Sequence, residues 1–231
     1  WAVPAGPAAG ADRKWTHVRI ATGGDCRPSN FTKPDGKLDG YEMELYKGLC
    51  ERMKVQGEVM VQPCSSLIPS LNAGKFDAIM SGLSVTPKRL EIVDFSQPYS
   101  NVGNTFAVLK TSPLAKLPDI GKVLSLTTNE ADAVKAINEI KPALKGKVVG
   151  VQSASIAAGF VDKYFKDIVT VREYKTPEEH YLDLVAGRVD IVVAAPTSIT
   201  TALSKSSSPV MAMAGPRCVG GVSGAGSGIA L

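Results

Sequence analysis

The chain has 231 residues, 44% of them hydrophobic, so it can bury the core of one large domain or of two smaller lobes. Its 26 basic and 22 acidic residues give a formal net charge of +4 with no basic cluster, and only 6% are aromatic, which argues against a nucleic-acid partner. No run of 18 or more apolar residues is present, which argues against a membrane-spanning helix.

The chain begins with small residues and prolines, "WAVPAGPAAGA". This composition is typical of the end of a secretory signal or of a flexible terminus, and we assign residues 1–16 to a flexible leader outside the fold. The cysteines are widely spaced and form no CxxC pair, so we expect no zinc site. Disulfides are possible in an oxidising compartment, although the spacing does not select a pairing. The four are Cys26, Cys50, Cys64 and Cys218.

The first half of the chain alternates predicted strands and helices. "HVRIATGG" (17–24) predicts a buried strand that ends in a glycine-rich turn, and "PDG" (34–36) predicts a second turn. A helix with apolar residues at helical spacing follows, then the strand "GEVMVQPC". A short helix closed by Gly74 leads into a strand over Phe76–Met80. This order predicts a largely parallel sheet covered by helices.

The second half repeats the scheme. "KGKVVGVQSASIAAGFVDKYF" predicts strand, polar turn and helix, and "VTVREYKT" predicts a further strand. The helix end and strand "LVAGRVDIVV" (184–193) match "LNAGKFDAIM" (71–80), which indicates two similar lobes. A polar helix over 129–146 is expected at the surface between them, and the last segment, "GPRCVGGVSGAGSGIAL", is expected to be extended.

The stretch "IMSGLSVTPKRLEIVDFSQPY" (79–99) carries the strongest chemical signal. Ser81, Gly82 and Ser84 directly follow a predicted strand, where ligands bind in open α/β sheets. Arg89 offers a planar fork of donors that matches a carboxylate, so a carboxylate receptor is one interpretation. The other is a helix capped by Thr86 and Pro87 with the arginine in solvent. Composition alone leaves both open.

Catalytic and cofactor motifs are missing from the sequence. It contains no G-x-S-x-G, HExxH or Walker loop, and its two histidines, His17 and His180, are expected to be solvated. We therefore predict no catalytic residue, no metal site and no cofactor.

The order of four segments resembles the polar-amino-acid substrate-binding proteins of ABC importers, among them lysine-arginine-ornithine, histidine and opine binders. The similarity runs from about residue 17 to the end of the chain, and residues 68–99 are its most specific part. The segments are "PDGKLDGYEMELYKGLCERMKV", "LIPSLNAGKFDAIMSGLSVTPKRLEIVDFSQPY", "GKVVGVQS" and "AGRVDIVVA".

The resemblance implies an α/β fold, the two-lobe periplasmic binding protein fold (type II), in which each lobe is a mainly parallel sheet flanked by helices. Lobe 1 would comprise 17–107 plus 213–231, and lobe 2 would comprise 108–212. The chain would cross between them near Asn104–Val108 and 213–222. Because the family continues beyond the position of Leu231, lobe 1 is expected to be incomplete at its C-terminal end.

The resemblance also implies a function. The protein would be a monomeric periplasmic component of an ABC importer that captures a polar amino acid or an opine-like derivative between its lobes and presents it to the membrane permease. It would not be an enzyme. Two alternatives stay open: a sensor or other non-transport protein with an altered ligand site, and a cyclohexadienyl-dehydratase-like enzyme. The latter needs a cleft carboxylate of raised pKa, for which Asp25 is the nearest residue.

Positions that match the family motifs imply the ligand contacts. Arg89 would bind the ligand carboxylate with help from Ser84, and Ser81 and Gly82 would face the amino group. The remaining contacts would come from lobe 2, as turn amides at a helix start, from Ser153, Ser155 and Ile156.

Four positions depart from the family pattern. Cys26 stands where an aromatic residue usually stacks on the ligand, and Cys64 where Trp or Phe is common. Ala195 replaces the aspartate that neutralises an α-ammonium, and Ala154 replaces a glycine. An unneutralised ammonium would be poorly satisfied, so we predict altered or weak binding of free amino acids. The ligand would be a carboxylate without a free α-ammonium, such as an opine-like conjugate, or the cleft would not bind tightly.

Overall fold

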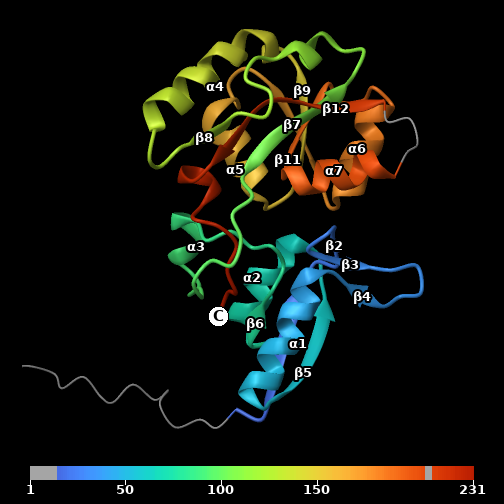
Figure 1. Cartoon of the computed structure of the whole chain (residues 1–231), viewed down its shortest axis with the longest axis vertical. Helices are drawn as coiled ribbons and strands as arrows, with labels where there is room; N and C mark the ends of the chain where they lie inside the picture. The colour runs from blue at the N-terminus through green and yellow to red at the C-terminus, as the bar shows by residue number, and fades with distance from the viewer. Residues whose placement is uncertain (1–14, 206–209) are drawn as a thin grey trace, which may run out of the picture.

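The computed structural model describes residues 15–205 and 210–231, so all but the last two residues of the assigned leader lie outside the described part. The chain forms two α/β lobes, one above the other in Figure 1, and passes between them twice. The first lobe contains α1–α3, β1–β6 and the chain end, and the second contains α4–α7 and β7–β12. The exact lobe boundaries inferred from the sequence stay a prediction.

The first lobe is built on a parallel three-stranded sheet, in the order β5-β1-β6, with a small antiparallel sheet, β2-β3-β4, beside it. The apolar strand β1 is buried on both faces: Ile20 packs toward α1, and the next residue, Ala21, packs toward α2. Its elements are β1 (His17–Thr22), β2 (Asp25–Cys26), β3 (Asn30–Thr32), β4 (Leu38–Asp39), α1 (Tyr41–Met53), β5 (Gln56–Val61), α2 (Cys64–Asn72), β6 (Ala78–Ile79) and α3 (Pro87–Leu90).

The second lobe is built on a six-stranded mixed sheet in the order β10-β9-β11-β7-β12-β8. The β9–β10 and β9–β11 pairs are parallel, whereas β7 is antiparallel to both β11 and β12. Its elements are β7 (Asn104–Leu109), the 3-10 helix η1 (Pro113–Lys116), β8 (Val123–Ser125), α4 (Glu130–Leu144), β9 (Val148–Gln152), α5 (Ile156–Tyr164), β10 (Thr170–Tyr174), α6 (Pro177–Val185), β11 (Ile191–Ala194), α7 (Pro196–Ser204), β12 (Met211–Val219) and the 3-10 helix η2 (Gly221–Ser223).

The repeated sequence motif produces the same junction in both lobes. Gly74 and Gly187 end the preceding turn with φ angles of 70° and 71°, a left-handed conformation that glycine adopts without steric cost. The aspartates of the motif accept backbone N–H bonds from the neighbouring strand: Asp77 from Arg19 and Asp190 from Val148, each at 2.8 Å. The similarity of the lobes predicted from sequence therefore extends to individual hydrogen bonds.

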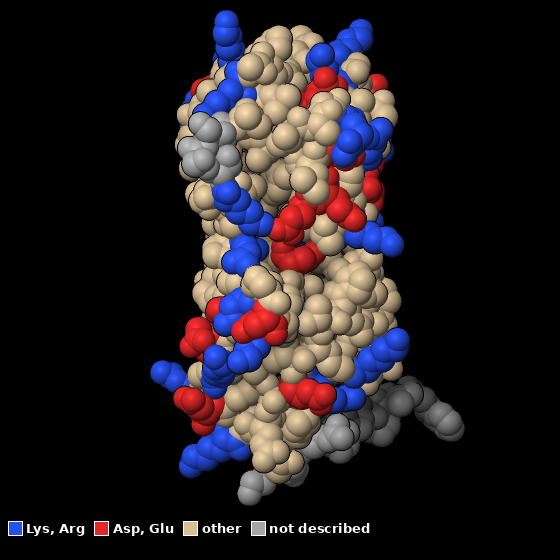
Figure 2. Space-filling view, turned by 90° about the vertical axis from the view of Figure 1, so that its right-hand side faces the viewer, with Lys and Arg blue, Asp and Glu red and all other residues tan. Residues whose placement is uncertain are grey.

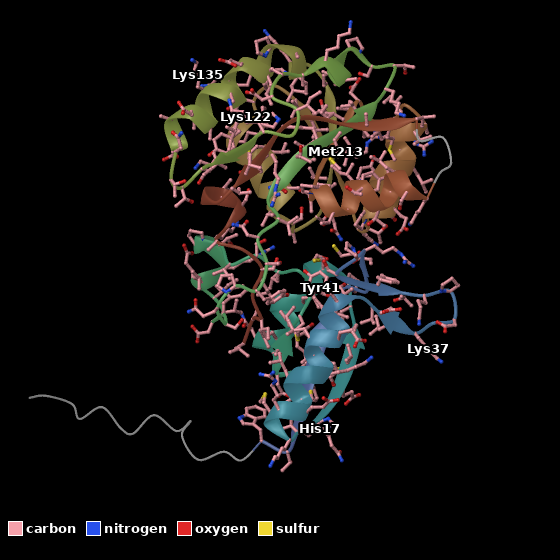
Figure 3. All side chains as sticks on the ribbon, in the orientation of Figure 1. His17, Lys37, Tyr41, Lys122, Lys135 and Met213 are labelled. Atoms are coloured by element: carbon pink, nitrogen blue, oxygen red, sulfur yellow. The ribbon has the colours of Figure 1, made fainter. Side chains whose placement is uncertain are left out.

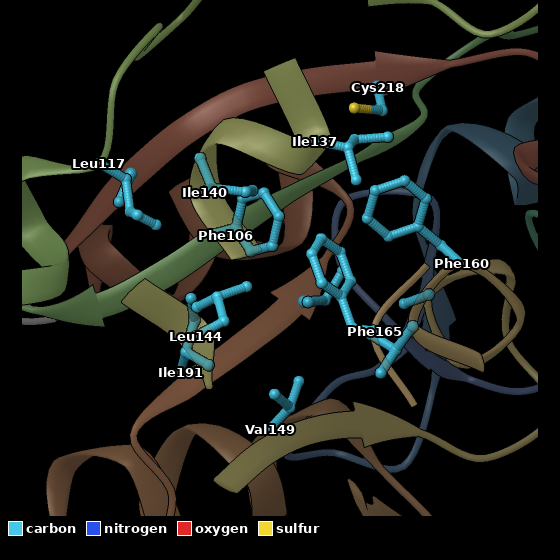
Figure 4. Packing of buried hydrophobic residues seen from close by; sticks show 14 of the residues in the cluster. Phe106, Leu117, Ile137, Ile140, Leu144, Val149, Phe160, Phe165, Ile191 and Cys218 are labelled. Carbon is cyan, nitrogen blue, oxygen red and sulfur yellow. The ribbon is translucent and has the colours of Figure 1, made fainter. Parts of the chain in front are cut away.

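The largest apolar cluster lies in the second lobe, between the sheet and the helices α4 and α5 (Figure 4). Three phenylalanines meet edge to face at its centre, with Phe160 and Phe165 at 5.7 Å between ring centroids and Phe106 at 6.2 Å from Phe165. A second cluster covers the opposite face of the sheet under α6 and α7. This arrangement explains the uninterrupted apolar run of β11, whose alternate residues enter different clusters.

The predicted surface helix over 129–146 is α4, and its assignment to the space between the lobes was wrong. Five apolar side chains along one stripe of the helix are buried in the core of the second lobe. They are Ala133, Ala136, Ile137, Ile140 and Leu144. The polar residues that suggested a solvated helix occupy only its outer face, as in an ordinary amphipathic helix.

The end of the chain returns to the first lobe in extended form, as expected. Ala230 and Ile79 exchange backbone hydrogen bonds at 2.9 and 3.1 Å, which places the last residues beside β6. Further back, Val85 donates to the carbonyl of Gly226 at 2.7 Å. The chain end therefore pairs along the loop that follows β6.

Candidate functional site

A cavity of about 110 Å³ lies between the two lobes. Nine of the ten positions inferred from the sequence line it, namely Cys26, Cys64, Ser81, Gly82, Ser84, Arg89, Ser155, Ile156 and Ala195. The tenth, Ser153, lies outside because its backbone N–H continues the sheet and donates to the carbonyl of Tyr174 at 2.8 Å. Tyr41 also lines the cavity, from the end of α1 that faces the second lobe (Figure 3).

The loop after β6 holds its polar groups by local capping. Thr86 accepts the backbone N–H of Arg89 at 3.3 Å, and Pro87 occupies the first position of α3. The two interpretations of residues 79–99, a capped helix and a carboxylate receptor, are therefore compatible. The capped turn holds Ser84 and Arg89 where both line the cavity.

The Arg89 guanidinium is half-buried and has no carboxylate within ion-pair distance among residues 15–205 and 210–231. It donates to two carbonyl oxygens, that of Ser84 at 2.9 Å and that of Ala154, across the cleft, at 2.8 Å. Burial lowers its pKa from the ordinary value. A desolvated guanidinium that contacts only neutral acceptors is the arrangement in which a carboxylate gives the largest electrostatic gain.

The wall of the second lobe is the turn between β9 and α5. Ser155 caps α5, because its hydroxyl accepts the backbone N–H of Ala158 at 3.2 Å. The first amides of α5, at Ile156 and Ala157, belong to residues that line the cavity. Unpaired amides at a helix start favour negative charge, so this wall complements Arg89 on the opposite side.

Glu42 is a structural residue of the site that the sequence did not reveal. It is fully buried, and its carboxylate accepts hydrogen bonds from Asn30 at 2.5 Å, from the backbone N–H of Gly82 at 2.7 Å and from the hydroxyl of Tyr99. The bond to Gly82 fixes a residue whose φ of 58° already requires glycine. In the sequence, Glu42 resembles any solvated acid in the first turn of a helix, and no pattern distinguishes it.

Asp25 is the one acidic residue among the described residues that line the cavity. Gln152 donates to it across the cleft at 3.1 Å. Burial raises the pKa of Asp25 above its ordinary value. Asp25 and Arg89 therefore supply opposite charges from the same lobe.

The two cleft cysteines lie between these charges. Burial raises the pKa of Cys26 to about 12 and that of Cys64 to about 11. Asp25 raises the pKa of Cys64 further and Arg89 opposes it, which places this thiol within electrostatic range of both. All four cysteines are free thiols. At neutral pH the cleft thiols are protonated, weakly polar groups in place of aromatic rings.

His180 was expected to be solvated, and the structure contradicts this. Its side chain is 1% exposed, lines the cavity from α6 and packs edge-on against Tyr181 at 4.3 Å. Its Nδ1 has no hydrogen-bond partner among the described residues. Burial lowers the pKa of His180 to about 3, so it is neutral at physiological pH. The acidic surroundings of "PEEHY" concealed its position because the flanking glutamates point outward.

Within residues 15–205 and 210–231, every helix is too short or too polar to span a lipid bilayer. The same residues form no group of three or more His, Cys, Asp or Glu side chains suited to a metal ion.

The chain is similar to known proteins of one family. The family model of the bacterial extracellular solute-binding proteins, family 3, matches residues 18–183. The octopine-binding periplasmic protein of Rhizobium meliloti is 46% identical over 203 residues, which are 88% of this chain and 68% of that protein. The L-arginine-binding protein of Pseudomonas aeruginosa is 33% identical over 178 residues, 77% of this chain and 60% of that protein.

A solved structure with the same architecture is an ancestral arginine-binding protein bound to arginine. It superposes with a TM-score of 0.77 at 27% identity, over 95% of this chain and 85% of that one. The match shows the type II periplasmic binding protein fold, and the chain spans most, but not all, of the length of such proteins.

Proposed function

The chain belongs to family 3 of the bacterial extracellular solute-binding proteins, and from this premise we propose that it binds an amino acid or amino-acid derivative by its carboxylate. The ligand lies in the interlobe cavity with its carboxylate on Arg89. The amides at the start of α5 close on it from the second lobe. The octopine- and arginine-binding relatives support this class of ligand.

The observation that carries the proposal is the state of Arg89. A half-buried guanidinium that faces a cavity and contacts only carbonyl oxygens has lost part of its hydration, and an anion would compensate for that loss. Its contact with Ala154 joins the two lobes. A bound carboxylate can therefore bridge the guanidinium and the helix start, which couples ligand binding to lobe closure, the hinge motion of two-lobe binders.

We place the protein in the periplasm as the solute-binding component of an ABC importer, with the membrane permease as its partner. The relatives are named as periplasmic binding proteins, which supports this placement. In this role the closed, ligand-bound form is the species that the permease recognises, and the protein works as a monomer.

Calorimetric titration with arginine, histidine and octopine tests the proposal. Arg89→Ala should weaken binding by at least about 2 kcal/mol, the scale for removing one partner of a desolvated charge pair. Lys88→Ala, an exposed cation on the same turn of α3, is the matched control and should leave affinity unchanged. Equal affinity of the Arg89→Ala variant and the unaltered protein would remove the basis of the proposal.

A second candidate is an enzyme of dehydratase type, and one observation favours it. Asp25 is a cleft carboxylate whose pKa is raised by burial, the property that a general acid requires. The same residue accepts a hydrogen bond from Gln152, which suits a structural contact across the cleft equally well. Ligand recovered after prolonged incubation and analysed by NMR separates the two. We expect unchanged ligand, whereas turnover that disappears in Asp25→Asn would establish the enzyme.

A further inference from the structure

A second, larger hollow of about 440 Å³ lies beside the interlobe cavity. We call it the α6–α7 groove. Its walls come from α6 and α7 of the second lobe, and β2 of the first lobe approaches its mouth, on the right side of the molecule in Figure 1. Asp25, Pro177 and Ser198 line both spaces. A ligand held in the cleft can therefore extend into the groove.

The walls of the groove are mainly apolar and partly open to solvent. Leu182 is 64% exposed and Val185 is 49% exposed, although both lie on a helix that otherwise packs against the core. Tyr181, Ala202 and Met211 form the deeper surface. Exposed apolar side chains that gather in a hollow beside a binding site suit an apolar part of the ligand.

The charges of the groove cancel. Two acidic and two basic residues line it: Asp25, Glu178, Arg27 and Lys205. Glu178 forms an ion pair with Lys205, and Arg27 lies over the ring of Phe31 at 3.6 Å. Figure 2 shows acidic and basic side chains next to one another near the level where the lobes meet, so this side offers a charged group on the ligand no surface of the opposite sign. The arm of the ligand in the groove is therefore neutral.

The cleft offers a free α-ammonium one carboxylate among its described lining residues. Ala195 supplies no charge, and the carboxylate of Asp25 is shared with Gln152, which donates to it at 3.1 Å. An amide nitrogen requires no counter-ion, because it carries no charge. Acylation of the amino group removes the charged ammonium and adds an apolar chain. An N-acylated ligand therefore fits both the cleft, which provides little for an ammonium, and the apolar walls of the groove.

We propose that the cleft and the α6–α7 groove together bind an N-acylated amino acid, with the carboxylate on Arg89 and the acyl chain between α6 and α7. This inference rests on the proposed function for the position of the carboxylate. The groove gives the protein selectivity for chain length, since each methylene group that leaves water adds affinity.

Titrations with free arginine, N-acetyl-arginine and N-hexanoyl-arginine test the inference. Each added methylene should tighten binding about threefold, so the hexanoyl ligand, which has four more methylenes, should bind about 80-fold more tightly than the acetyl ligand. Leu182→Asn should reduce this chain-length ratio several-fold. Ile120→Asn is the matched control. Ile120 is an apolar residue of similar exposure, 56%, in the same lobe but outside the groove. Circular dichroism confirms that both variants fold.

The outcomes separate the groove from the carboxylate site. Arg89→Ala should weaken the binding of all three ligands and leave the ratio of the hexanoyl to the acetyl affinity intact. An Arg89→Ala variant of unchanged affinity would contradict the proposed function alone. Equal affinity for the acetyl and hexanoyl ligands, or exclusion of the hexanoyl ligand, overturns the inference and leaves the groove to a protein partner. A ratio unaffected by Leu182→Asn also overturns it, and a protein that binds none of the series contradicts both proposals.

Discussion

The two walls of the cleft are built by different means. The first lobe presents side-chain charge on a loop that is braced from behind, by Glu42 through Gly82 and by the chain end along Val85. The second lobe presents backbone amides on a short turn at the start of α5. The two lobes therefore contribute different groups. The first lobe fixes the position of the Arg89 guanidinium, and the second supplies backbone N–H donors of the kind found at any well-capped helix start.

The apolar cores of the two lobes also differ, in size and in arrangement. The main cluster of the second lobe contains three interlocking phenylalanines and spans sheet and helices, whereas the first lobe divides a smaller apolar core between the two faces of a three-stranded sheet. A lobe with less apolar burial depends more on its polar contacts. The predictions that follow test this difference, beginning with the largest expected effect.

Removing Glu42 should damage the first lobe most. Glu42→Ala leaves three donors without their acceptor, those of the buried Asn30 and of the partly buried Gly82 and Tyr99. We expect a loss of about 4 kcal/mol in the free energy of unfolding, the sum of several unsatisfied buried groups. Urea unfolding monitored by circular dichroism measures it.

Glu44→Ala provides the control for this prediction. Glu44 lies on the same helix, is exposed and pairs with Lys47, so its removal should cost less than about 1 kcal/mol. Similar losses for the two variants would mean that the network behind Gly82 does not support the first lobe.

The second lobe should respond to acid through His180. Its folded-state pKa of about 3 lies below the ordinary value, so between pH 6.5 and pH 3 the unfolded chain binds a proton that the folded chain does not. Stability should therefore fall as pH decreases through this window, by about 1.4 kcal/mol per pH unit from this residue, and the penalty is absent above pH 6.5.

Chemical denaturation at pH 7, 6, 5 and 4 measures the slope. His180→Gln should show a shallower decline than the unaltered protein, whereas His17→Gln, a change at an exposed histidine, should follow the unaltered protein. If the slopes of His180→Gln and the unaltered protein coincide, the buried, neutral state of His180 is excluded.

The smallest expected effect lies in the turn of the second wall. Ala154 has a φ of 58°, a left-handed conformation that costs a residue with a Cβ roughly 1 kcal/mol. Ala154→Gly should therefore raise the free energy of unfolding by about 1 kcal/mol. Ala186→Gly, at an exposed helix end with a φ of −79°, should lower it by a similar amount. Destabilisation by both substitutions would show that the turn at 154 carries no strain.

The fold was predictable because its signals are local and repeated. The Ala-Gly junctions before Asp77 and Asp190 specify one helix-to-strand connection twice, and the apolar strands between them leave few alternatives to a covered parallel sheet. The place of α4 was predicted wrongly because its outer face is polar, and the apolar stripe that is buried, which includes Ile137, Ile140 and Leu144, was not recognised as a core face. The sequence of an amphipathic helix shows that it has an apolar face, but only the tertiary structure shows which sheet that face packs against.

Site residues were predictable from the sequence where polar side chains directly follow a predicted strand. They were not predictable where their role depends on burial by distant segments. Ser84 and Arg89 follow β6, and the cap at Thr86 is visible in the sequence. Glu42 and His180 look like solvated residues of acidic helix starts, yet both are 1% exposed or less. Their environment is set by segments far away along the chain.

By itself, the sequence determined the two-lobe α/β plan, the hydroxyl-rich loop with its arginine, and the presence of small or weakly polar side chains at Cys26, Cys64 and Ala195. These features depend on periodicity, caps and residue type, which are local properties. Tertiary structure alone decided that Glu42 supports Gly82, that Gln152 meets Asp25 and that the α6–α7 groove lies beside the cleft. Each of these joins segments brought together only by packing, and burial then sets the charge state and strength of the contact.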